Sequence, residues 1–369
     1  MSEILQEIPT PANIAMYSYV GDFQGCGHIR VIFPSMYMNF LRYGDYQFHA
    51  SYGAFFINEL KYYKDFTLVQ FQRATTPRHL DLITHYLTNI KKAVKTPLIY
   101  EIDDLLWDIP KWNIASHFYN RLFETTKLIM GKVDGIVVSV DKLKDIYGEF
   151  NSNIEVIPNH LCKFLWSDAK FDEHIPSGKP RIFYQGSDTH FCIQKLTDMG
   201  YKGGDFGNKL IDFIRKTTDK YQWVFMGGRP HEIKDLIASG HIEHHNWRSI
   251  LDYPQYVKSL KVDIGLGILQ PNLFNECKSN IKNLEYVAIG VPGVYSDIEP
   301  YKNTTVKCKT DEEIIDSIER LAANQDLRRL TWQSDYDKVK DLLFWEENFN
   351  IIKYVNTYMK LFGKKLKDV

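Results

Sequence analysis

The stretch NECKSNIKNLEYVAIGVPGVYSD, residues 275–297, predicts an amphipathic helix that runs through a Gly-x-Pro turn into a short strand. We expect a single helix whose first turn carries Lys278, Ser279 and Lys282. Glu285 follows Lys278 by seven residues, and this spacing places the two side chains on one face of the helix. A helix N-terminus offers free N–H groups and a partial positive charge, so this end suits a phosphate.

The same helix has room for a whole nucleoside diphosphate along its length. Lys278 and Lys282 would bind the phosphates, and the Glu285 carboxylate would accept hydrogen bonds from both ribose hydroxyls. The spacing fits a second interpretation equally well. In that interpretation the two lysines are an ordinary solvated pair and Glu285 is a surface acid.

Strand-like and helix-like stretches alternate along the chain, which indicates parallel sheets covered by helices. In the first half the strands are expected at 13–20, 67–73, 97–104, 133–140 and 153–161. In the second half they are expected at 181–187, 222–228, 242–247, 262–269 and 290–297. The fold class is therefore α/β, with two Rossmann-like doubly wound domains facing a cleft where ligands of open α/β sheets bind.

The domain boundaries follow from a stretch without apolar periodicity. We expect a first domain over 1–165, a linker over 166–180 and a second domain over 181–345. The last residues, 346–369, are expected to form a helix that packs back on the first domain.

Composition restricts the class of protein. A chain of 369 residues suits two domains, and a net charge of −1 gives no overall basic field for nucleic acid or membrane. The five cysteines form no CxxC pair, which favours a reducing compartment and neither a disulfide framework nor a zinc site. The acidic N-terminus lacks an apolar signal core, and no run of 18 apolar residues exists, so a cytoplasmic location without a membrane span is expected.

Residues 263–301 resemble the donor-binding segment of retaining glycosyltransferases of the GT-B fold, in the family-4-like group. The matching pattern is Asn-x-x-Lys-Ser-x-x-Lys-x-x-Glu-Tyr, formed here by Asn275, Lys278, Ser279, Lys282, Glu285 and Tyr286. VIPNHL, DGIVVSVDKL, FMGG and NWRSI resemble further pieces of that family. The resemblance implies a nucleotide-diphosphate sugar as donor, retention of configuration, no cofactor and no metal. It also makes the first domain the acceptor side.

One position departs from the family pattern. The first glutamate of the family, which touches the transferred sugar, maps to Cys277, and the nearest acid is Glu276. Its role would fall to Glu276, to Asn275 or to the backbone. The resemblance implies that the acceptor attacks from the leaving-group side, that the β-phosphate takes the acceptor's proton, and that fixed cations stabilise the leaving group.

Two glycine-containing loops are candidates for the donor site. The first carries Gly25, Gly27 and Arg30 between a strand and a helix. It lacks the third glycine of a dinucleotide loop, so it is interpreted as a donor-approach loop or as a plain tight turn. The second, YQGSDTH, carries Gly186 and Ser187, and either closes over the diphosphate or forms a turn capped by Asp188.

Three further features complete the candidate set. Asp103 and Asp104 end a strand and could face the acceptor, cap a helix, or form the metal-binding acid pair of the single-domain glycosyltransferase fold, which we reject. Trp247 and Arg248 could hold the nucleobase or pack in the core. The predicted catalytic residues are Lys278, Lys282, Glu276 and Asp103. The predicted donor-binding residues are Gly25, Gly27, Arg30, Gly186, Ser187, Trp247, Arg248, Asn275, Ser279, Asn280 and Glu285.

The acceptor is the least determined element. The Lys-, Tyr-, Phe- and Asn-rich composition resembles phage enzymes that glycosylate hydroxymethylated pyrimidines in DNA, which would act in the host cytoplasm. Basic residues of the first domain could contact that DNA, namely Arg73, Arg78, Lys91, Lys92 and Lys95. The alternatives are a saccharide or envelope glycan acceptor, an isomerase of the same shape, and a non-catalytic protein that binds a nucleotide sugar. The oligomeric state is left open.

Overall fold

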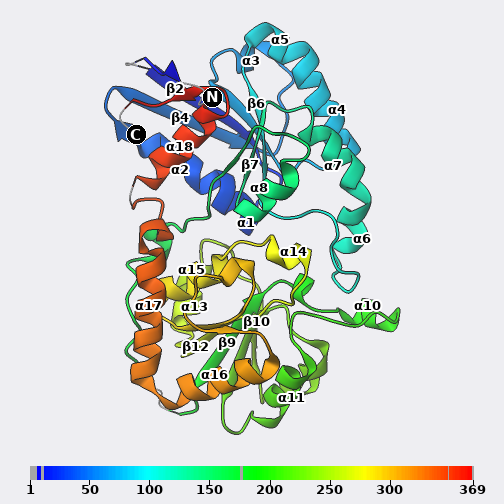
Figure 1. Cartoon of the computed structure of the whole chain (residues 1–369), viewed down its shortest axis with the longest axis vertical. Coiled ribbons are helices and arrows are strands. Elements are labelled where there is room, and N and C mark those ends of the chain that lie inside the picture. The colour runs from blue at the N-terminus through cyan, green and yellow to red at the C-terminus, as the bar shows by residue number, and fades with distance from the viewer. Residues whose placement is uncertain (1–5, 10–11, 175–177, 348, 368–369) are drawn as a thin grey trace. The chain divides into compact units, whose positions relative to one another are not determined.

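The structure is a computed structural model that describes residues 6–9, 12–174, 178–347 and 349–367. Two compact units make up the chain (Figure 1). Unit 1 consists of Met1–Leu106, Arg121–Cys162 and Phe344–Val369. Unit 2 consists of Trp107–Asn120 and Lys163–Leu343. Residues 107–120 therefore group with unit 2, although the sequence division places them in the first domain. Part of the predicted linker, 175–177, lies outside the described residues.

Unit 2 contains a six-stranded sheet in which every pairing is parallel. Its strands are β9 (Arg181–Gly186), β10 (Gln222–Gly227), β11 (Glu243–His245), β12 (Ile264–Gly267), β13 (Gly293–Ser296) and β14 (Lys307–Cys308). Their spatial order is β11-β10-β9-β12-β13-β14, which is the 3-2-1-4-5-6 order of a Rossmann fold. The strand order reverses between β9 and β12. Ligands of such sheets bind at the carboxyl ends of those two strands.

Helices cover both faces of this sheet because alternate side chains of each strand point to opposite sides. Ile182 and Tyr184 of β9 lie in one buried apolar cluster with α11 (Asn208–Lys216) and α16 (Asp311–Ala323). Phe183 points the other way, and its ring contacts Tyr286 with ring centroids 6.2 Å apart. The second face therefore supports the helix that carries the candidate donor residues.

The remaining helices of unit 2 are short, apart from α17. They are α6 (Ser116–Tyr119), α9 (Lys163–Trp166), α10 (Gln194–Asp198), α12 (Lys234–Ala238), α13 (Tyr253–Ser259), α14 (Leu273–Glu276), α15 (Ile281–Ala288) and α17 (Gln325–Leu343). The start of α16 is fixed by Thr310, whose side chain accepts a hydrogen bond from the Glu313 amide. Helix α17 lies against α15, since the Trp332 indole donates to the Val287 carbonyl at 2.9 Å.

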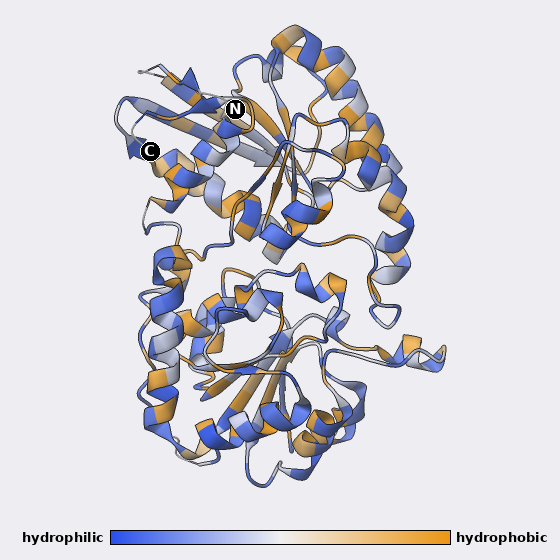
Figure 2. Cartoon of the chain, viewed as in Figure 1, coloured by the Kyte–Doolittle hydropathy of each residue, from blue (hydrophilic) through white to orange (hydrophobic). Residues whose placement is uncertain are grey.

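Unit 1 contains a seven-stranded sheet that is parallel except for one edge strand. Its strands are β2 (Ala12–Tyr19), β3 (Arg42–Tyr43), β4 (Tyr46–Gly53), β5 (Leu68–Gln72), β6 (Leu98–Ile102), β7 (Gly135–Val138) and β8 (Ile154–Val156). The order is β3-β4-β2-β5-β6-β7-β8, and β3 pairs antiparallel with β4. The prediction of an α/β fold with parallel sheets is thus confirmed. The strands at the centre of both sheets are mainly apolar, as the orange ribbon in Figure 2 shows.

Strand β4 was not expected from the sequence. Its residues, YQFHASYG, alternate between buried and exposed over the first four positions, and the last four are half-buried or exposed. It lies near the edge of the sheet, where one side chain in two remains in water and no apolar run is required. A two-stranded parallel pair, β1 (Gln6–Glu7) with β15 (Lys364–Lys365), also belongs to unit 1.

Helices of unit 1 come from three separate parts of the chain. They are α1 (Gly25–Gly27), α2 (Phe33–Phe40), α3 (Leu60–Tyr63), α4 (Pro77–His85), α5 (Lys91–Val94), α7 (Phe123–Met130), α8 (Asp141–Tyr147) and α18 (Asn350–Lys360). Helix α18 packs against α2 within this unit. Among the described helices, none is both long enough and apolar enough to cross a membrane.

Candidate functional site

The predicted single helix from residue 275 is wrong: the structure divides this stretch into two helices. Helix α14 ends at Glu276 and α15 begins at Ile281. Lys278 and Ser279 therefore lie in the intervening segment rather than in a helical turn. Ser and Asn side chains compete for backbone hydrogen bonds and disfavour helix interiors, and the sequence Ser279-Asn280 at this point is a physical reason for the break.

Glu285 lies on α15 beside the carboxyl end of β9 and is 7% exposed. Its Oε2 atom accepts a hydrogen bond from the Gln185 side chain at 2.6 Å and from the Tyr253 hydroxyl at 3.4 Å. Within the described part of the chain, its Oε1 atom makes no hydrogen bond. Burial raises the pKa of Glu285 to about 7, although the Lys282 charge and the Tyr253 hydrogen bond act in the opposite direction. The interpretation of Glu285 as a solvated surface acid is therefore wrong.

Lys282 lies one helical turn before Glu285 and is 6% exposed. Its Nζ atom lies 5.5 Å from the centre of the Tyr184 ring. It forms neither an ion pair nor a hydrogen bond with any residue that the structure describes. Burial, together with the nearby Lys278 charge, lowers the pKa of Lys282 to about 8, against the opposing effect of Glu285 and Asp205. A charged side chain that is buried without an acceptor is costly, which makes Lys282 a candidate for binding an anion.

Lys278 adds a second cation beside Lys282. Its Nζ atom lies 4.4 Å from the centre of the Phe274 ring, and no ion pair is found for it among the described residues. The Lys278 charge contributes to lowering the pKa of Lys282, so the two ammonium groups are close enough to repel each other. Mutual repulsion of two unpaired cations is relieved when an anion such as a diphosphate binds between them.

The loop after β9 brings a histidine to the same place. His190 Nδ1 lies 2.6 Å from Asp205 Oδ2, and both residues are buried. Asp205 Oδ1 accepts from the Gln270 amide at 3.0 Å and from the Asn275 side chain at 2.7 Å. Asn275 Oδ1 is buried without a hydrogen bond among the described residues. The predicted donor residue Asn275 thus holds the Asp205 carboxylate, and its Oδ1 atom is still available.

Close backbone packing shapes the carboxyl edge of β9 and β10. Gly227 has φ of +80°, and a Cβ there would lie 2.5 Å from the Gly186 carbonyl oxygen and 2.7 Å from the Trp247 ring. Only glycine fits this position. Trp247 is 52% exposed, so about half of its side chain remains accessible. Arg248 is placed differently, since its guanidinium lies 4.1 Å from the centre of the Tyr256 ring.

The other predicted donor residues lie around this edge. Ser187 directly follows β9, and its hydroxyl contacts that of Thr189. Glu276 ends α14 and is half-buried, while the neighbouring Cys277 is fully buried. Ser279 and Asn280 are half-buried in the segment before α15.

The predicted glycine loop of unit 1 forms the short helix α1. A Cβ on Gly27 would lie 1.7 Å from the Asp22 carbonyl oxygen, so the turn requires glycine there, whereas Gly25 has open space. Arg30 is buried and donates to Glu101 at 2.6 Å and to the Ile157 carbonyl at 2.6 Å. These bonds occupy Arg30 within unit 1, so its predicted role in donor binding gains no support.

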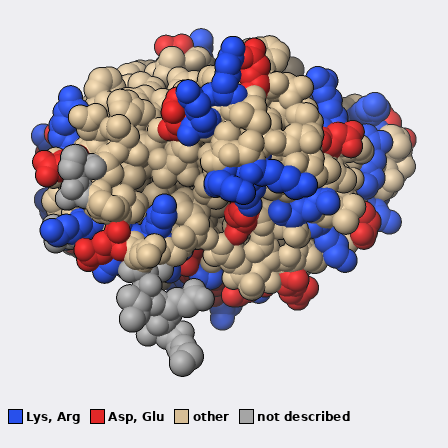
Figure 3. Space-filling view, turned by 90° about the horizontal axis from the view of Figure 1, so that it is seen from above, with Lys and Arg blue, Asp and Glu red and all other residues tan. Residues whose placement is uncertain are grey.

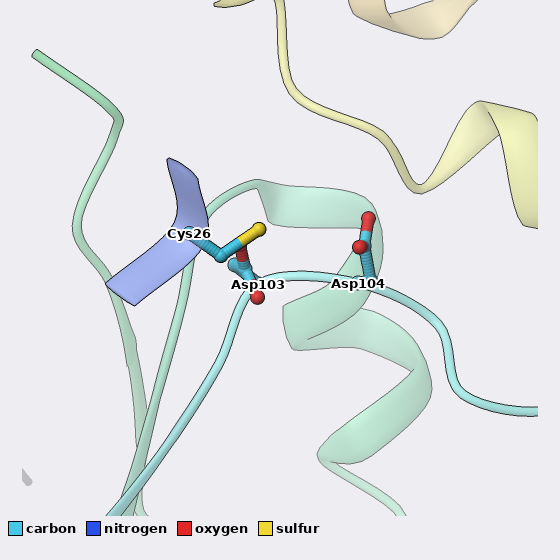
Figure 4. Close-up of side chains that lie close together, drawn as sticks. All are labelled: Cys26, Asp103 and Asp104. Carbon is cyan, nitrogen blue, oxygen red and sulfur yellow. The ribbon is translucent and has the colours of Figure 1, made fainter. Parts of the chain in front are cut away.

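Asp103 and Asp104 share one cation. The Arg73 guanidinium donates to Asp103 Oδ1 at 2.6 Å and also pairs with Asp104. Ligand atoms of Cys26, Asp103 and Asp104 lie within 4.8 Å of one another. Figure 4 shows these three side chains. Burial opposes ionisation of Asp103, but the charges of Arg73 and Arg30 outweigh it and lower the pKa of Asp103. A guanidinium thus supplies the positive charge that a metal ion would bring to this acid pair.

The basic residues proposed for DNA do not form one continuous field. Arg73 pairs with the two aspartates and Lys91 with Asp134, while Arg78, Lys92 and Lys95 are exposed. On the face in Figure 3, basic and acidic side chains are interspersed, with wide uncharged areas between them. This distribution agrees with the balanced net charge.

Comparison with known proteins gives a likeness in structure alone. No family model and no curated protein matches the chain. The chain is similar to the N-terminal domain of trehalose-6-phosphate phosphatase from Candida albicans, with 12% identity, 96% and 99% of the two chains covered and a TM-score of 0.54. It is also similar to the glycotransferase of kitacinnamycin, with 10% identity, 96% and 100% covered and a TM-score of 0.46. The first likeness concerns the fold, and the second is too loose to carry an argument.

Sequence reasoning did not predict several of the contacts that complete these sites. Gln185 and Tyr253 hold Glu285, Asp205 holds His190, and Arg73 joins the acid pair. Each partner is at least 15 residues from the group it contacts. The one usable signal was position, because Gln185 and Arg73 both lie at the carboxyl end of a strand.

Proposed function

We propose that the chain is a retaining glycosyltransferase that moves a sugar from a nucleotide-diphosphate sugar to an acceptor hydroxyl. The proposal includes membership of the GT-B fold class. One observation carries it: unit 2 holds a buried, unpaired Lys282 and a buried Glu285 with an available oxygen, at the point where the strand order reverses. A dianionic diphosphate followed by a ribose matches this pair of groups.

The charge balance of the site favours an anion with hydroxyls attached. Lys278 and Lys282 together offer two positive charges without acidic partners among the described residues. Glu285 offers Oε1 as an acceptor, which a ribose hydroxyl can fill. A simple phosphate would satisfy the lysines and leave Glu285 buried without that hydrogen bond, so a nucleotide is the better match.

The proposed chemistry places the positive charge where it is needed. Cleavage of the anomeric C–O bond leaves negative charge on the diphosphate, and Lys278 and Lys282 are fixed in position to stabilise it. The acceptor oxygen attacks from the side of the leaving group, and its proton passes to the β-phosphate. No protein nucleophile is required for this route. Fixed cations supply the electrostatic stabilisation, and the proposal includes no metal or cofactor.

Other residues are assigned by their position around the nucleotide. Trp247 would stack on the nucleobase, because its exposed ring lies over Gly227 at the end of β10. Asn275 and Glu276 would contact the transferred sugar. Asp103 is proposed on the acceptor side, where its pairing with Arg73 keeps it ionised as an acceptor of hydrogen bonds.

The acceptor is proposed to be a hydroxymethylated pyrimidine in phage DNA. The support from unit 1 is a set of exposed basic side chains on and after neighbouring helices, namely Arg78, Lys92 and Lys95. A saccharide or envelope glycan acceptor is the alternative.

The experiment is a donor and acceptor screen with a mass-spectrometric readout. The protein is incubated with a panel of nucleotide sugars, alone and with hydroxymethylcytosine DNA or oligosaccharides. Slow hydrolysis of one donor, and sugar transfer with retained anomeric configuration when the acceptor is added, would support the proposal. An epimerised sugar would instead indicate an isomerase, and tight binding without turnover a non-catalytic protein. Failure of every nucleotide sugar to bind would refute all three.

A further inference from the structure

His190 occupies a fixed position that the proposed chemistry above does not use. It ends the short 3-10 helix Asp188–His190 directly after β9 and is 7% exposed. Asp205 accepts from two fixed N–H donors through Oδ1, so its Oδ2 is held against His190 Nδ1. An ionised carboxylate can only accept, so Nδ1 carries the imidazole proton. The other ring nitrogen, Nε2, makes no hydrogen bond among the described residues.

The charged and titratable groups around His190 come from four elements. Asp205 lies before α11, Lys282 on α15, Lys278 in the segment before α15, and Tyr184 on β9, with its ring centroid 6.2 Å from that of His190. Burial and the Lys282 and Lys278 charges lower the pKa of His190 to about 4, although Asp205 opposes them. The ring is therefore neutral near pH 7 while the site holds no anion. A bound diphosphate cancels the two lysine charges and leaves Asp205 to act on the ring.

We propose that His190 takes up one proton from solvent when a nucleoside diphosphate binds, and then presents Nε2–H to the diphosphate while Asp205 holds Nδ1–H. This inference rests on the proposed function, because it requires the anion to occupy the site beside Lys282. The only bond that forms is Nε2–H: the buffer supplies its proton when the nucleotide binds and takes it back on release. His190 thus becomes a third cation only when negative charge is present, so three positive charges never lie together here without an anion.

The test is calorimetry of nucleotide binding at pH 7.0 in two buffers that differ in ionisation enthalpy. The ligand is whichever of ADP, UDP, GDP and CDP binds most tightly to the full chain. At this pH the terminal phosphate, with a pKa of about 6, is mostly ionised. Lys282, with a pKa of about 8, is mostly charged already. Glu285, with a pKa of about 7, is partly protonated at this pH in both proteins, so the difference between them is the decisive quantity. Wild-type protein should take up as much as about one proton more per nucleotide than His190→Gln.

Two variants separate a proton-linked role from a structural one. His241 is exposed and hydrogen-bonds Ser239, so His241→Gln should retain the wild-type uptake. Asp205→Asn removes the negative charge that stabilises the imidazolium, and should reduce the uptake even where binding persists.

The outcomes distinguish this inference from the proposed function. Binding with equal proton uptake in wild type and His190→Gln would overturn the inference and leave the proposed function intact. Absence of nucleotide binding in the wild type would overturn both. If His190→Gln does not fold, nitrogen NMR of the histidine-labelled wild type decides. The Nε2 resonance should move to an imidazolium value when the nucleotide is added, and an unchanged resonance would refute the inference.

Discussion

Replacing Lys282 by methionine should stabilise the unliganded protein while it removes nucleotide binding. The Lys282 side chain is buried, and its ammonium has no ion pair or hydrogen bond among the described residues, so the protein leaves this charge uncompensated. Methionine retains most of the apolar stem and its packing but not the charge. Functional sites commonly contain unpaired charged groups that lower the stability of the protein.

The magnitude follows from the burial of the charge. A fall of the Lys282 pKa from 10.5 to about 8 corresponds to about 3 kcal/mol, at about 1.4 kcal/mol per pKa unit. Loss of the contact with the Tyr184 ring offsets about 1 kcal/mol of this gain. The free energy of unfolding should therefore rise by about 2 kcal/mol at pH 7. For a unit of this size the melting temperature should rise by about 4–8 °C.

The pH dependence gives a second measurement of the same effect. Because the pKa of Lys282 is lower in the folded state, the folded protein binds fewer protons than the unfolded chain between about pH 8 and pH 10.5. The wild type therefore gains stability relative to Lys282→Met as the pH rises through this window. The advantage of the variant should be complete below about pH 8 and disappear by about pH 10.5.

The assay is urea denaturation of both proteins, with calorimetric titration of nucleoside diphosphates on the same samples. Lys209→Met is the matched control, because Lys209 is exposed and pairs with Glu312 on the surface of unit 2. It should leave both stability and nucleotide affinity nearly unchanged. A less stable Lys282→Met protein that binds nucleotides as well as the wild type would refute the reasoning.

Three further predictions concern the same site. Glu285→Gln should weaken the binding of ribonucleoside diphosphates and reduce the difference in binding free energy, about 1–3 kcal/mol, by which they exceed the 2′-deoxy forms. Competition binding measures this difference, and equal losses for both ligands would contradict the ribose contact. Transfer should persist in EDTA, since Lys278 and Lys282 provide the charge that faces the leaving group, and an absolute requirement for a divalent ion in a rate assay would disprove this. Gly227→Ala should lower the free energy of unfolding by more than about 1 kcal/mol, because the added Cβ would clash with the Gly186 carbonyl and the residue has a positive φ. Unchanged denaturation curves would contradict this and would show that the ends of β9 and β10 can move apart.

Local patterns sufficed for the fold class and for one part of the site. The alternation of apolar strands with amphipathic helices indicated parallel sheets, which both units contain. Lys282 and Glu285 lie three residues apart, so any helix through them places both side chains near one another. The prediction of one continuous helix was wrong, because the Ser279 and Asn280 side chains compete for backbone hydrogen bonds at a point where the apolar period alone favours a helix. Strand β4 was missed because a strand near the edge of a sheet can leave alternate side chains in water and so needs no apolar run.

The sequence by itself determined which residue types stand at the end of each strand, because the apolar periodicity of a helix or strand involves only residues that are close together in the chain. Only the tertiary structure decided which of them are buried and what they contact. The sequence alone allows Lys282 to be an ordinary solvated cation, whereas the folded unit buries its side chain without an ion pair among the described residues. Segments that are far apart in the sequence bring Asp205 to His190 and Glu101 to Arg30. These contacts depend on strand order and on the removal of water from charged groups, and both arise only when the whole unit has folded.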